Sequence, residues 1–294
     1  MDRLGSMSVF VAVTSAGSFS AASRQLRMPL PTVSRRVSDL ESHLKAKLFV
    51  RSTRKLALTD AGQAYLVACK RVLEQIAEAE RGASGQYNVP QGELFLTAPI
   101  VFGRLHVLPV VTEFLRTHPQ VDVRMMLADR ALNLVDDHLD LAVRIGALPD
   151  SSLVGTRIGH IRRVVCASPA YLAGHGVPRS PADLSGHVCV TFTGAGETDS
   201  WKFSAGPSVR VHARLAVNTA EAAIEGAIAG VGLTRVLSYQ VADEVAAGRL
   251  VVVLRKFEPE PSPVSLVRVQ ERRLTAKLRA FLDFAAPKLR ERLT

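Results

Sequence analysis

The stretch that decides the fold of the first sixty residues is 31–41, Pro-Thr-Val-Ser-Arg-Arg-Val-Ser-Asp-Leu-Glu. Val33, Val37, Leu40 and, just beyond it, Leu44 recur at i, i+4, i+7 and i+11, which is the spacing of one helix face. The other faces carry hydroxyl groups and two arginines. The pattern therefore predicts a helix with one buried apolar face and one basic, hydroxyl-rich face.

Two shorter helices precede this basic helix. Apolar residues at helical spacing predict a first helix that ends at Ala16-Gly17, and a second one that begins after the N-cap residue Ser18. Pro29 ends the second helix because proline disfavours the helical conformation of the residue before it. The third helix begins near Pro31, since its first turn tolerates proline. Two short helices joined by a tight turn, the second one basic, form a helix-turn-helix.

A small hairpin follows. Residues 48–50 and 56–58 are short apolar segments that flank Arg51-Ser52-Thr53-Arg54-Lys55. Such a basic tip between two extended pieces predicts a wing beside the helix-turn-helix.

A long helix is predicted next, capped by Thr59 or Asp60. Its apolar positions follow a narrow 3-4-3-4-3 spacing that only Glu80 interrupts, which favours pairing of helices from two subunits over burial in a core. Small and helix-breaking residues over 82–90 end the helix and predict a hinge. The seam consists of Leu66, Cys69, Leu73, Ile76, Glu80 and Ala83.

The charge is concentrated at the amino-terminal end. The chain of 294 residues carries a net charge of +10, and residues 1–62 hold ten Lys or Arg against four Asp or Glu. A compact basic module indicates a polyanionic partner, although a solvated basic surface is the alternative on charge alone.

Residues 91–294 alternate strand-like and helix-like segments, which predicts an α/β fold with mostly parallel sheets in two small lobes. Runs such as 163–166 and 249–253 are apolar on both faces, as buried parallel strands require. The predicted strands are Leu94–Thr97, Val121–Leu127, Leu141–Ile145, Val164–Ala167, Val188–Phe192, Val209–Val217, Gly232–Val236, Leu250–Leu254 and Val264–Val269. The predicted helices are 103–117, 219–229, 238–247 and 273–286.

The amino-terminal stretch closely resembles the DNA-binding head of LysR-type transcriptional regulators. The resemblance rests on Phe19-Ser20-Ala21-Ala22, on Val33 to Glu41 and on Leu48 to Gly62, and it continues through 108–109, 114–115, 118–119, 140–146 and 230–233. It therefore covers essentially the whole chain. It implies a winged helix-turn-helix, a linker helix that forms a dimer, usually assembled into a tetramer, and a two-lobed effector domain shaped like a periplasmic solute-binding protein.

The resulting organisation has three parts. Residues 1–60 form the DNA-binding domain, 61–89 the linker helix and hinge, and 90–294 the effector domain, with lobe I at about 90–163 plus 268–294 and lobe II at about 164–267. The expected function is sequence-specific transcription regulation, modulated by a small molecule bound between the lobes. The expected partners are double-stranded promoter DNA, a small effector with a carboxylate as its candidate class, other copies of the chain, and RNA polymerase. With no signal peptide or membrane span in the sequence, we expect a cytoplasmic protein.

The third helix and the wing supply the candidate DNA contacts. Arginine can pair with guanine O6 and N7 in the major groove, hydroxyl groups can bind phosphates or bases, and a wing can reach the backbone or the minor groove. The resemblance marks Pro31, Ser34 and Arg35 as groove-facing and Arg54 as the minor-groove arginine, whereas any single arginine taken alone could be a surface charge. The predicted DNA-binding residues are Ser18, Pro31, Thr32, Ser34, Arg35, Arg36, Ser38, Arg51, Thr53 and Arg54.

Two positions depart from the family pattern. Pro29 stands where these regulators often have a Ser or Thr N-cap, and Lys45 stands where a glycine usually ends the recognition helix. If a left-handed backbone is needed there, Lys45 costs on the order of 1 kcal/mol relative to glycine.

A crevice between two α/β lobes binds ligands at the carboxyl ends of strands and at helix N-termini. The hydroxyl of Thr97 and the N–H groups after it are a candidate anion cradle, and Asn218 or Thr219 caps a helix, with an ordinary cap as the alternative in both cases. Arg144 has two interpretations, a carboxylate contact or a structural ion pair with Asp140 or Asp129. The predicted effector-binding residues are Thr97, Ile100, Val101, Phe102, Arg144, Ile145, Gly146, Phe192, Thr193, Asn218 and Thr219.

Enzyme and metal sites find little support in the sequence. It contains no G-x-S-x-G, H-E-x-x-H or phosphate-binding-loop motif, its histidines have no metal-ligand spacing, and we expect no cofactor. Three scattered cysteines leave a thiol sensor at Cys166 or Cys189 as a minor alternative. A second hypothesis, a solute-binding or catalytic α/β protein with an incidental helical head, needs an export signal or a catalytic constellation, and neither is visible.

Overall fold

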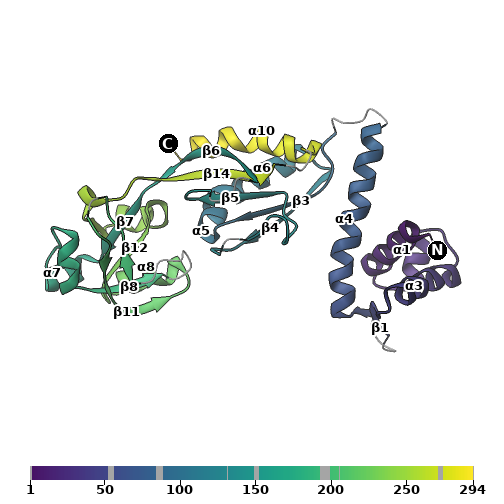
Figure 1. Cartoon of the computed structure of the whole chain (residues 1–294), viewed down its shortest axis with the longest axis horizontal. Helices are drawn as coiled ribbons and strands as arrows, with labels where there is room; N and C mark the ends of the chain where they lie inside the picture. Colours follow the sequence, from purple (N-terminus) through teal and green to yellow (C-terminus); the bar gives the residue numbers. More distant parts are fainter. Residues whose placement is uncertain are drawn as a thin grey trace. The chain divides into compact units, whose positions relative to one another are not determined.

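The computed structural model describes residues 2–51, 56–83, 89–130, 132–148, 152–192, 199–204, 206–270 and 274–293. The chain forms two compact units, Met1–Asn88 and Val89–Thr294 (Figure 1). Each unit has a buried core of its own.

The amino-terminal unit is a winged helix-turn-helix followed by a long helix. Its second helix begins at Ser18, whose hydroxyl oxygen accepts the N–H of Ala21 at 3.1 Å, which confirms the predicted cap. The wing strands are antiparallel, with Phe49 opposite Leu58. The elements are α1 (Arg3–Ala16), α2 (Phe19–Gln25), α3 (Leu30–Leu44), β1 (Phe49–Arg51), β2 (Leu56–Leu58) and α4 (Asp60–Ala83).

Apolar side chains from these elements meet in one core. Val33 and Val37 of α3 are fully buried beside Phe10 of α1, so the predicted apolar face is the buried one. The ring of Phe49 packs edge-on against Phe10 and Phe19, with ring centroids 5.3 and 5.6 Å apart. The wing is therefore anchored in the same core as the helices.

The start of α4 is tied to the wing. Thr59 Oγ1 accepts the N–H of Gly62 at 2.9 Å and donates to the carbonyl of Lys47 at 2.6 Å, so Thr59 rather than Asp60 caps the helix. A Cβ atom on Gly62 would lie 2.0 Å from the carbonyl oxygen of Leu48. Only glycine lets the helix come this close to the wing strand.

The predicted pairing seam on α4 is divided. Cys69 is fully buried in the core of its own unit and is not available to a second subunit, and Leu66, partly buried, packs against the same core. Leu73 and Ile76, farther along the helix, are only partly buried. The sequence analysis missed this division because a 3-4 spacing does not show where the head's own core stops.

No single described helix is long and apolar enough to cross a membrane. The bent pair α1 and α2, which turns by 115°, meets the length and composition criteria together. Its apolar residues Val9, Phe10 and Ala22 are buried in the core of the head.

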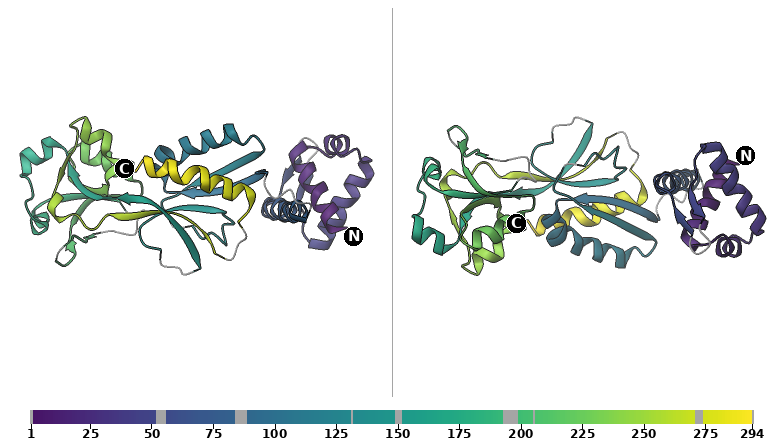
Figure 2. Two further views of the ribbon diagram at one scale, coloured as in Figure 1. Left: turned by 90° about the horizontal axis from the view of Figure 1, so that it is seen from above. Right: turned by 90° about the horizontal axis from the view of Figure 1, so that it is seen from below.

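The second unit contains two five-stranded sheets, each the basis of one lobe (Figure 1). In lobe I the strand order is β4-β3-β5-β14-β6, and α6 and α10 lie on the same side of the sheet, where Phe114 and Phe281 meet (Figure 2). The elements of lobe I are β3 (Gly92–Ala98), α5 (Ile100–Phe102), η1 (Gly103–Val107), α6 (Leu108–Thr117), β4 (Val121–Leu127), β5 (Leu141–Ile145), β6 (Leu153–Ile161), β14 (Ser262–Val269) and α10 (Ala276–Glu291).

In lobe II the strand order is β11-β8-β12-β7-β13. Ile224 and Ala227 of α8 pack on one face of this sheet against Val164 and Val236, and Leu172 of α7 belongs to the core on the other face. The elements of lobe II are β7 (Arg163–Ala167), α7 (Pro169–His175), η2 (Pro181–Gly186), β8 (Val188–Phe192), β9 (Ser200–Trp201), β10 (Val209–Arg210), β11 (His212–Val217), α8 (Ala220–Ile228), β12 (Leu233–Leu237), η4 (Ser238–Gln240), α9 (Ala242–Ala246), β13 (Val251–Val253) and η5 (Arg255–Phe257).

The α/β character is confirmed, but the expectation of mostly parallel sheets is wrong. In the described sheets β14 runs antiparallel to β5 and β6, and β7 runs antiparallel to β12 and β13. The reason is the connection between the lobes. A strand that arrives from the other lobe is not delivered by a helical crossover within its own sheet, so it need not run parallel to its neighbours.

The chain passes between the lobes twice. β6 of lobe I continues through Arg162 into β7 of lobe II, and η5 leads back to β14 in lobe I. The sequence analysis missed β6 because Gly155-Thr156-Arg157 and Gly159-His160 interrupt its apolar pattern. It also placed 262–267 in lobe II, whereas all of β14 pairs with strands of lobe I.

The predicted helix 103–117 consists of two segments and is preceded by the short helix α5. α5 runs into a π-helical turn, η1, before α6 begins. A Cβ atom on Gly103 would lie 2.3 Å from the Leu127 side chain, so glycine lets this turn approach β4. Short π-helical turns inside helices are frequent at functional sites.

Candidate DNA interface and effector crevice

The recognition helix α3 separates its faces as the spacing predicts. Val33 and Val37 are fully buried, Pro31 and Arg35 are exposed, and Thr32 and Ser34 are half-buried. Ser38, also half-buried, completes the predicted set on this helix. Arg35 is thus presented to the surroundings by a helix whose opposite face is fixed in the core.

Arg36 takes a different direction from Arg35. Its Nη1 lies 3.5 Å from Oδ2 of Asp2, the residue whose carboxylate also accepts the Gly5 N–H at the start of α1. Adjacent residues of a helix point about 100° apart, so Arg36 faces α1 while Arg35 faces outward. The structure therefore gives the two predicted arginines separate surroundings.

The turn into α3 has an unusual construction. Pro29 holds the N-cap position and makes no side-chain cap, so the departure noted in the sequence is real. Arg27 adopts a left-handed backbone with φ 51°, and Ser23 Oγ donates to the carbonyl of Met28 at 2.6 Å, which fixes the turn from the side of α2. α3 starts at Leu30, one residue before the predicted start.

The residue that ends α3 has the left-handed backbone considered in the sequence analysis. Lys45 lies in the left-handed region with φ 52° and ψ 31°. Its N–H bonds to the helix carbonyls of Glu41 and Ser42, so the strained backbone terminates the helix.

Glu41 is a structural residue of the interface that the sequence analysis did not single out. Its side chain is 3% exposed, and its carboxylate accepts the N–H groups of Leu48 at 2.9 Å and Phe49 at 3.3 Å and the Lys47 Nζ at 3.1 Å. Burial opposes the charge, but these hydrogen bonds outweigh it and lower the pKa of Glu41. One carboxylate therefore joins the recognition helix to the first wing strand.

The wing tip is only partly described. Arg51 ends β1, opposite Leu56. Thr53 and Arg54, predicted as wing contacts, lie outside the described residues.

In lobe I the predicted anion cradle is already filled by a side chain of the protein. The Thr97 hydroxyl donates to the carbonyl of Met126 at 2.9 Å, and the Ile100 N–H donates to Oδ1 of Asp129 at 3.0 Å. Burial raises the pKa of Asp129, and the nearby charge of Glu221 adds to this against the effect of the Ile100 hydrogen bond. A helix N-terminus that holds a carboxylate of its own does not attract a second anion.

Of the two interpretations of Arg144, the structural ion pair is not formed in the part of the chain that the structure describes, and the carboxylate contact stays a prediction. Its guanidinium donates to the carbonyl of Leu132, and no ion pair with Asp129 or Asp140 is formed among the described residues. Beside it, Gly146 adopts φ 111° and donates its N–H to the carbonyl of Pro263 at 2.8 Å. Ile145, half-buried, pairs with β14, so this segment is the end of the central strand β5.

In lobe II the cap at α8 is Thr219 rather than Asn218. Its Oγ1 accepts the Ala222 N–H at 3.3 Å, the ordinary cap that was the alternative to a ligand contact. Phe192, half-buried, ends β8, and Thr193 lies outside the described residues.

A hollow of about 220 Å³ lies between α5–η1 of lobe I and α8–α9 of lobe II. Of the predicted effector residues, only Val101 lines it, and Phe102 is instead fully buried in the core. Four carboxylates and one arginine surround it, which disfavours an anionic ligand. These charged residues are Glu221, Glu225, Asp243, Glu244 and Arg104.

The three cysteines are buried thiols. Burial raises the pKa of Cys69 to about 11 and of Cys166 and Cys189 to about 12. Because the thiolate is the reactive form, these environments disfavour a thiol sensor. Among the described residues, no three His, Cys, Asp or Glu side chains gather as metal ligands.

Family comparisons agree with this geometry. Residues 4–63 match the bacterial regulatory helix-turn-helix protein, lysR family, and residues 88–290 match the LysR substrate binding domain. The chain belongs to the LysR family of transcriptional regulators. Members of this family bind promoter DNA and small-molecule effectors and form oligomers.

Relatives of this LysR-type regulator match along nearly its whole length. The probable HTH-type transcriptional regulator LtrA of Klebsiella pneumoniae is 34% identical, over 97% of this chain and 94% of its own. The HTH-type transcriptional activator AaeR of Escherichia coli K12 is 32% identical, over 96% and 93%. A transcriptional repressor of Pseudomonas aeruginosa is 35% identical, over 97% and 91%. The names are those of regulators, and they include both an activator and a repressor.

Solved structures of full-length LysR-type regulators show the same fold. CrgA of Neisseria meningitidis is 30% identical with a TM-score of 0.62, over 97% of this chain and 98% of that chain. The virulence activator AphB of Vibrio cholerae is 25% identical with a TM-score of 0.61, over 96% and 98%.

Proposed function

We propose that this regulator reads its operator chiefly through Arg35, which enters the major groove on the exposed face of α3. The observation that supports this is the contrast between two neighbours: Arg35 is exposed, whereas Arg36 lies 3.5 Å from Asp2. An arginine free to reach guanine O6 and N7 can specify a base, whereas one held at the start of α1 chiefly positions that helix. Thr32, Ser34 and Ser38 bind the flanking phosphates or bases, and Ser18 binds a phosphate.

The wing completes the interface in this proposal. Arg51, Thr53 and Arg54 contact the backbone and the minor groove beside the recognition helix. Glu41 supports that role indirectly, since it fixes β1 to the last turn of α3. The distance between the two DNA-contacting elements is therefore set inside the head.

We further propose the domain roles expected from the sequence: residues 1–60 bind DNA, 61–89 link and dimerise, and 90–294 sense the effector. The part of α4 beyond Cys69, with Leu73 and Ile76 partly buried, supplies the pairing face. Two dimers form a homotetramer that bridges two half-sites and bends the DNA between them. An effector bound between the lobes shifts the population of two tetramer shapes and thereby the contact with RNA polymerase in the cytoplasm.

Binding of the full chain to the DNA upstream of its own gene tests the proposal. Fluorescence anisotropy is measured against a scrambled fragment at several salt concentrations. We expect the regulator to prefer the upstream fragment by about 1000-fold or more, and its affinity to fall steeply and linearly on a log–log plot against salt. Equal affinity for both fragments at every salt concentration would contradict the proposal.

A further inference from the structure

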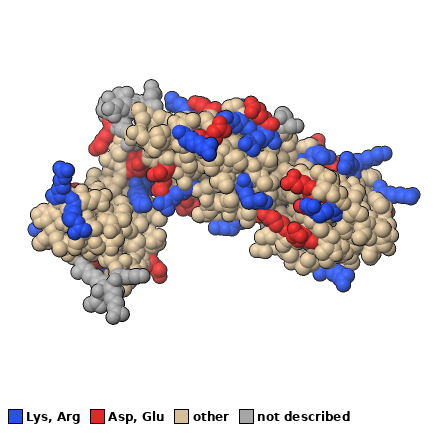
Figure 3. Space-filling model, turned by 180° about the vertical axis from the view of Figure 1, so that it is seen from behind, with Lys and Arg blue, Asp and Glu red and all other residues tan. Residues whose placement is uncertain are grey.

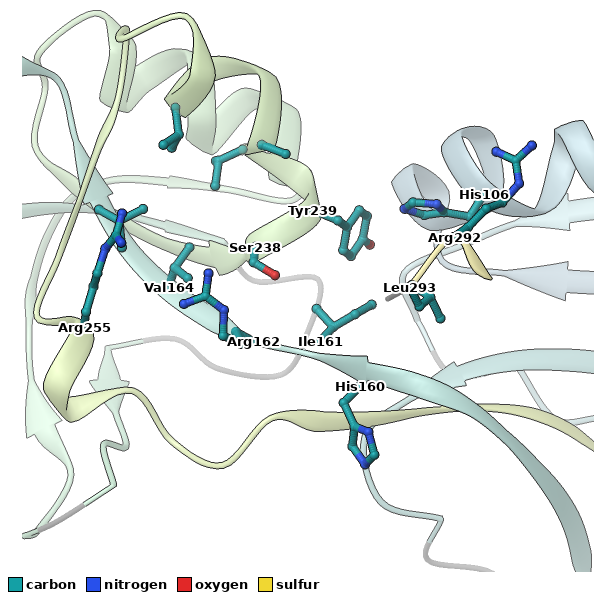
Figure 4. A pocket seen from close by; sticks show the side chains of 14 residues that line it. His106, His160, Ile161, Arg162, Val164, Ser238, Tyr239, Arg255, Arg292 and Leu293 are labelled. Carbon is teal, nitrogen blue, oxygen red and sulfur yellow. The ribbon is translucent and has the colours of Figure 1, made fainter. Parts of the chain in front are cut away.

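A groove of about 340 Å³ opens beside the strand that connects the lobes, where β6 passes through Arg162 into β7 (Figure 4). Its described lining contains three arginines and two histidines and no Asp or Glu. None of its lining residues belongs to the predicted effector-binding set. The basic side chains are Arg162, Arg255, Arg292, His106 and His160.

The positive charge is a feature of this groove and not of the whole surface of the second unit. Over the second unit, basic and acidic side chains are interspersed on the face drawn in Figure 3. The neighbouring hollow, which shares Tyr239 with the groove, is lined by four carboxylates and one arginine. Two adjacent recesses therefore carry opposite charge, and only this groove suits an anion.

Arg162 and Arg255 approach the groove from two different connections. Figure 4 shows both side chains on the same side of the groove near Val164, whereas Arg292 lies on the other side beside His106. Arg162 Nη1 lies 3.1 Å from Oε2 of Glu258, which joins the two connections between the lobes. Arg255 makes no ion pair with any described residue.

The floor of the groove is apolar. Val164 and Val241 are almost completely buried, and Val245 and Val252 lie beside them. A site with apolar walls and a few charged groups is typical of pockets for small organic ligands. A bare inorganic anion would leave these walls without a partner.

Both lobes contribute residues to the end of the groove near Tyr239. His106 of η1 and Tyr239 of η4 meet with ring centroids 5.4 Å apart, and Phe102 packs on both rings. The His106 Nε2 is buried without a hydrogen-bond partner among the described residues, whereas the Tyr239 hydroxyl lies near Gln240 and the backbone of Phe102. An unsatisfied buried polar group is unfavourable, so His106 is a group at which a bound ligand can supply a partner.

We propose that this groove is a second effector site, which binds a small carboxylate with a compact apolar body through Arg162 and Arg255. The carboxylate competes with Glu258 for Arg162, and the apolar body lies on Val164 and Val241 toward Tyr239. Binding loosens the Arg162–Glu258 pair that joins the two connections, and this changes the angle between the lobes. The regulatory consequence rests on the proposed function, whereas the binding itself does not.

Isothermal titration of the full chain with hexanoate tests the site, with hexanamide as the neutral analogue of the same shape and inorganic phosphate as the bare anion. We expect hexanoate to bind at least about ten-fold more tightly than either analogue, because it alone has both the charge and the apolar body. Arg255→Gln and Arg162→Gln should each weaken hexanoate binding about ten-fold or more, since charge-assisted bonds to the carboxylate are lost. Both side chains are largely exposed, so these variants fold.

Two further variants make the test specific. Glu258→Gln removes the competing carboxylate and should tighten hexanoate binding several-fold, a gain that damage to the fold would not produce. Arg104→Gln, the exposed arginine of the neighbouring hollow, is the matched control and should leave the affinity unchanged.

Three results would overturn the proposal. The first is an absence of hexanoate binding at about 10 mM, a concentration that nearly saturates a site with a Kd of about 1 mM. The second is binding of hexanamide or phosphate as tight as that of hexanoate. The third is identical behaviour of Arg255→Gln and Arg104→Gln.

DNA binding of the same proteins separates this inference from the proposed function. Specific DNA binding with hexanoate affinity insensitive to Arg255 would refute only the groove. Arg255-dependent hexanoate binding without specific DNA binding would refute only the DNA proposal. If both hold, hexanoate should change operator affinity in the wild type and not in Arg255→Gln, because the coupling between two sites is reciprocal.

Discussion

Oε1 of Glu41 accepts the backbone N–H of Leu48 at 2.9 Å, so a carboxylate in the last turn of α3 holds the residue that leads into the wing. The same oxygen also accepts the Phe49 N–H at 3.3 Å, and the side chain is 3% exposed. The recognition helix and the first wing strand are thereby fixed to each other by one ionised group. This relationship gives the head a defined dependence on pH.

Glu41→Gln should destabilise the head by about 1 kcal/mol near neutral pH, because hydrogen bonds to a charged acceptor become bonds to a neutral one. The pKa of Glu41 is lowered from its ordinary value of 4.5. Its stabilisation is therefore complete above that value and is lost as the pH falls through the lower pKa of the folded state. Urea unfolding of the full chain as a function of pH measures this. The free energy of unfolding of the variant should fall less than that of the wild type as the pH is lowered. Parallel curves of this free energy against pH for the two proteins would contradict the assignment.

The contribution of Asp129 to stability should depend on pH in the opposite direction. Burial and the nearby Glu221 raise its pKa, so protonation of Asp129 favours the folded state. The folded state therefore loses stability as the pH rises from 3.8 through the raised pKa. Asp129→Asn keeps an acceptor for the Ile100 N–H and removes the buried charge. We expect the variant to be more stable than the wild type at neutral pH and equal at low pH, as measured by urea unfolding. A loss of stability at neutral pH would show that the charge itself holds α5.

Arg35→Ala should reduce discrimination between operator and scrambled DNA by about 10- to 100-fold, the loss expected when a base-contacting arginine is removed. Arg51→Ala should weaken binding to both fragments alike and reduce the salt slope, since it removes a backbone contact. Anisotropy titrations on both fragments measure this. Equal losses on operator and scrambled DNA for both variants would refute the division of roles.

Arg36→Ala serves as the matched comparison on the same helix. Its partner Asp2 is exposed, so the ion pair is worth about 0.5 kcal/mol at most. We expect operator discrimination close to that of the wild type, measured in the same titrations. A loss as large as that of Arg35→Ala would place Arg36 in the groove instead.

Lys45→Gly should stabilise the head by about 1 kcal/mol, because Lys45 holds a left-handed backbone that glycine adopts without strain. Hydrogen exchange of α3 peptides in the full chain measures the change. Gly17→Ala is the converse control, since Gly17 has φ 70° and open space around it. It should destabilise α1 through backbone strain alone, and a neutral result at both positions would contradict the argument.

Gly62→Ala should be more damaging than either of these changes. Its added Cβ would lie 2.0 Å from the Leu48 carbonyl oxygen, a backbone atom that cannot move without β1. We expect a cost of about 2 kcal/mol and faster exchange of the Leu48 and Phe49 amides. Unchanged exchange of those amides would show that the wing adapts independently of α4.

Much of the head could be predicted from the sequence because its signals are local. The face of Val33 and Val37, the cap at Ser18 and the left-handed Lys45 each depend on residues within a few positions of one another. In the second unit, short apolar runs located most strands, but β6 was missed because its glycines and polar residues break the alternation.

The effector-binding residues stay a prediction, but the structure gives two of them protein partners that the sequence did not indicate. Thr97 and the N-terminus of α5 have the residue types of an anion cradle, but Asp129, some thirty residues later, already fills it. Arg144 has the residue type of a carboxylate contact, but the backbone of Leu132 accepts its hydrogen bond. Residue type shows what a side chain can bind, and only its neighbours show what it does bind.

The sequence by itself determined the winged helix-turn-helix, the long helix and the alternating α/β unit, because caps, turn residues and the periods of helices and strands act over a few residues. Only the tertiary structure decided that Arg36 faces Asp2, that Glu41 holds the wing, that β14 returns to lobe I, and that Arg162 and Arg255 share a groove. These contacts join residues of different elements, from seven positions apart for Glu41 and Leu48 to far more for the others. No local period encodes such a contact, and packing of whole elements is what brings the two side chains together.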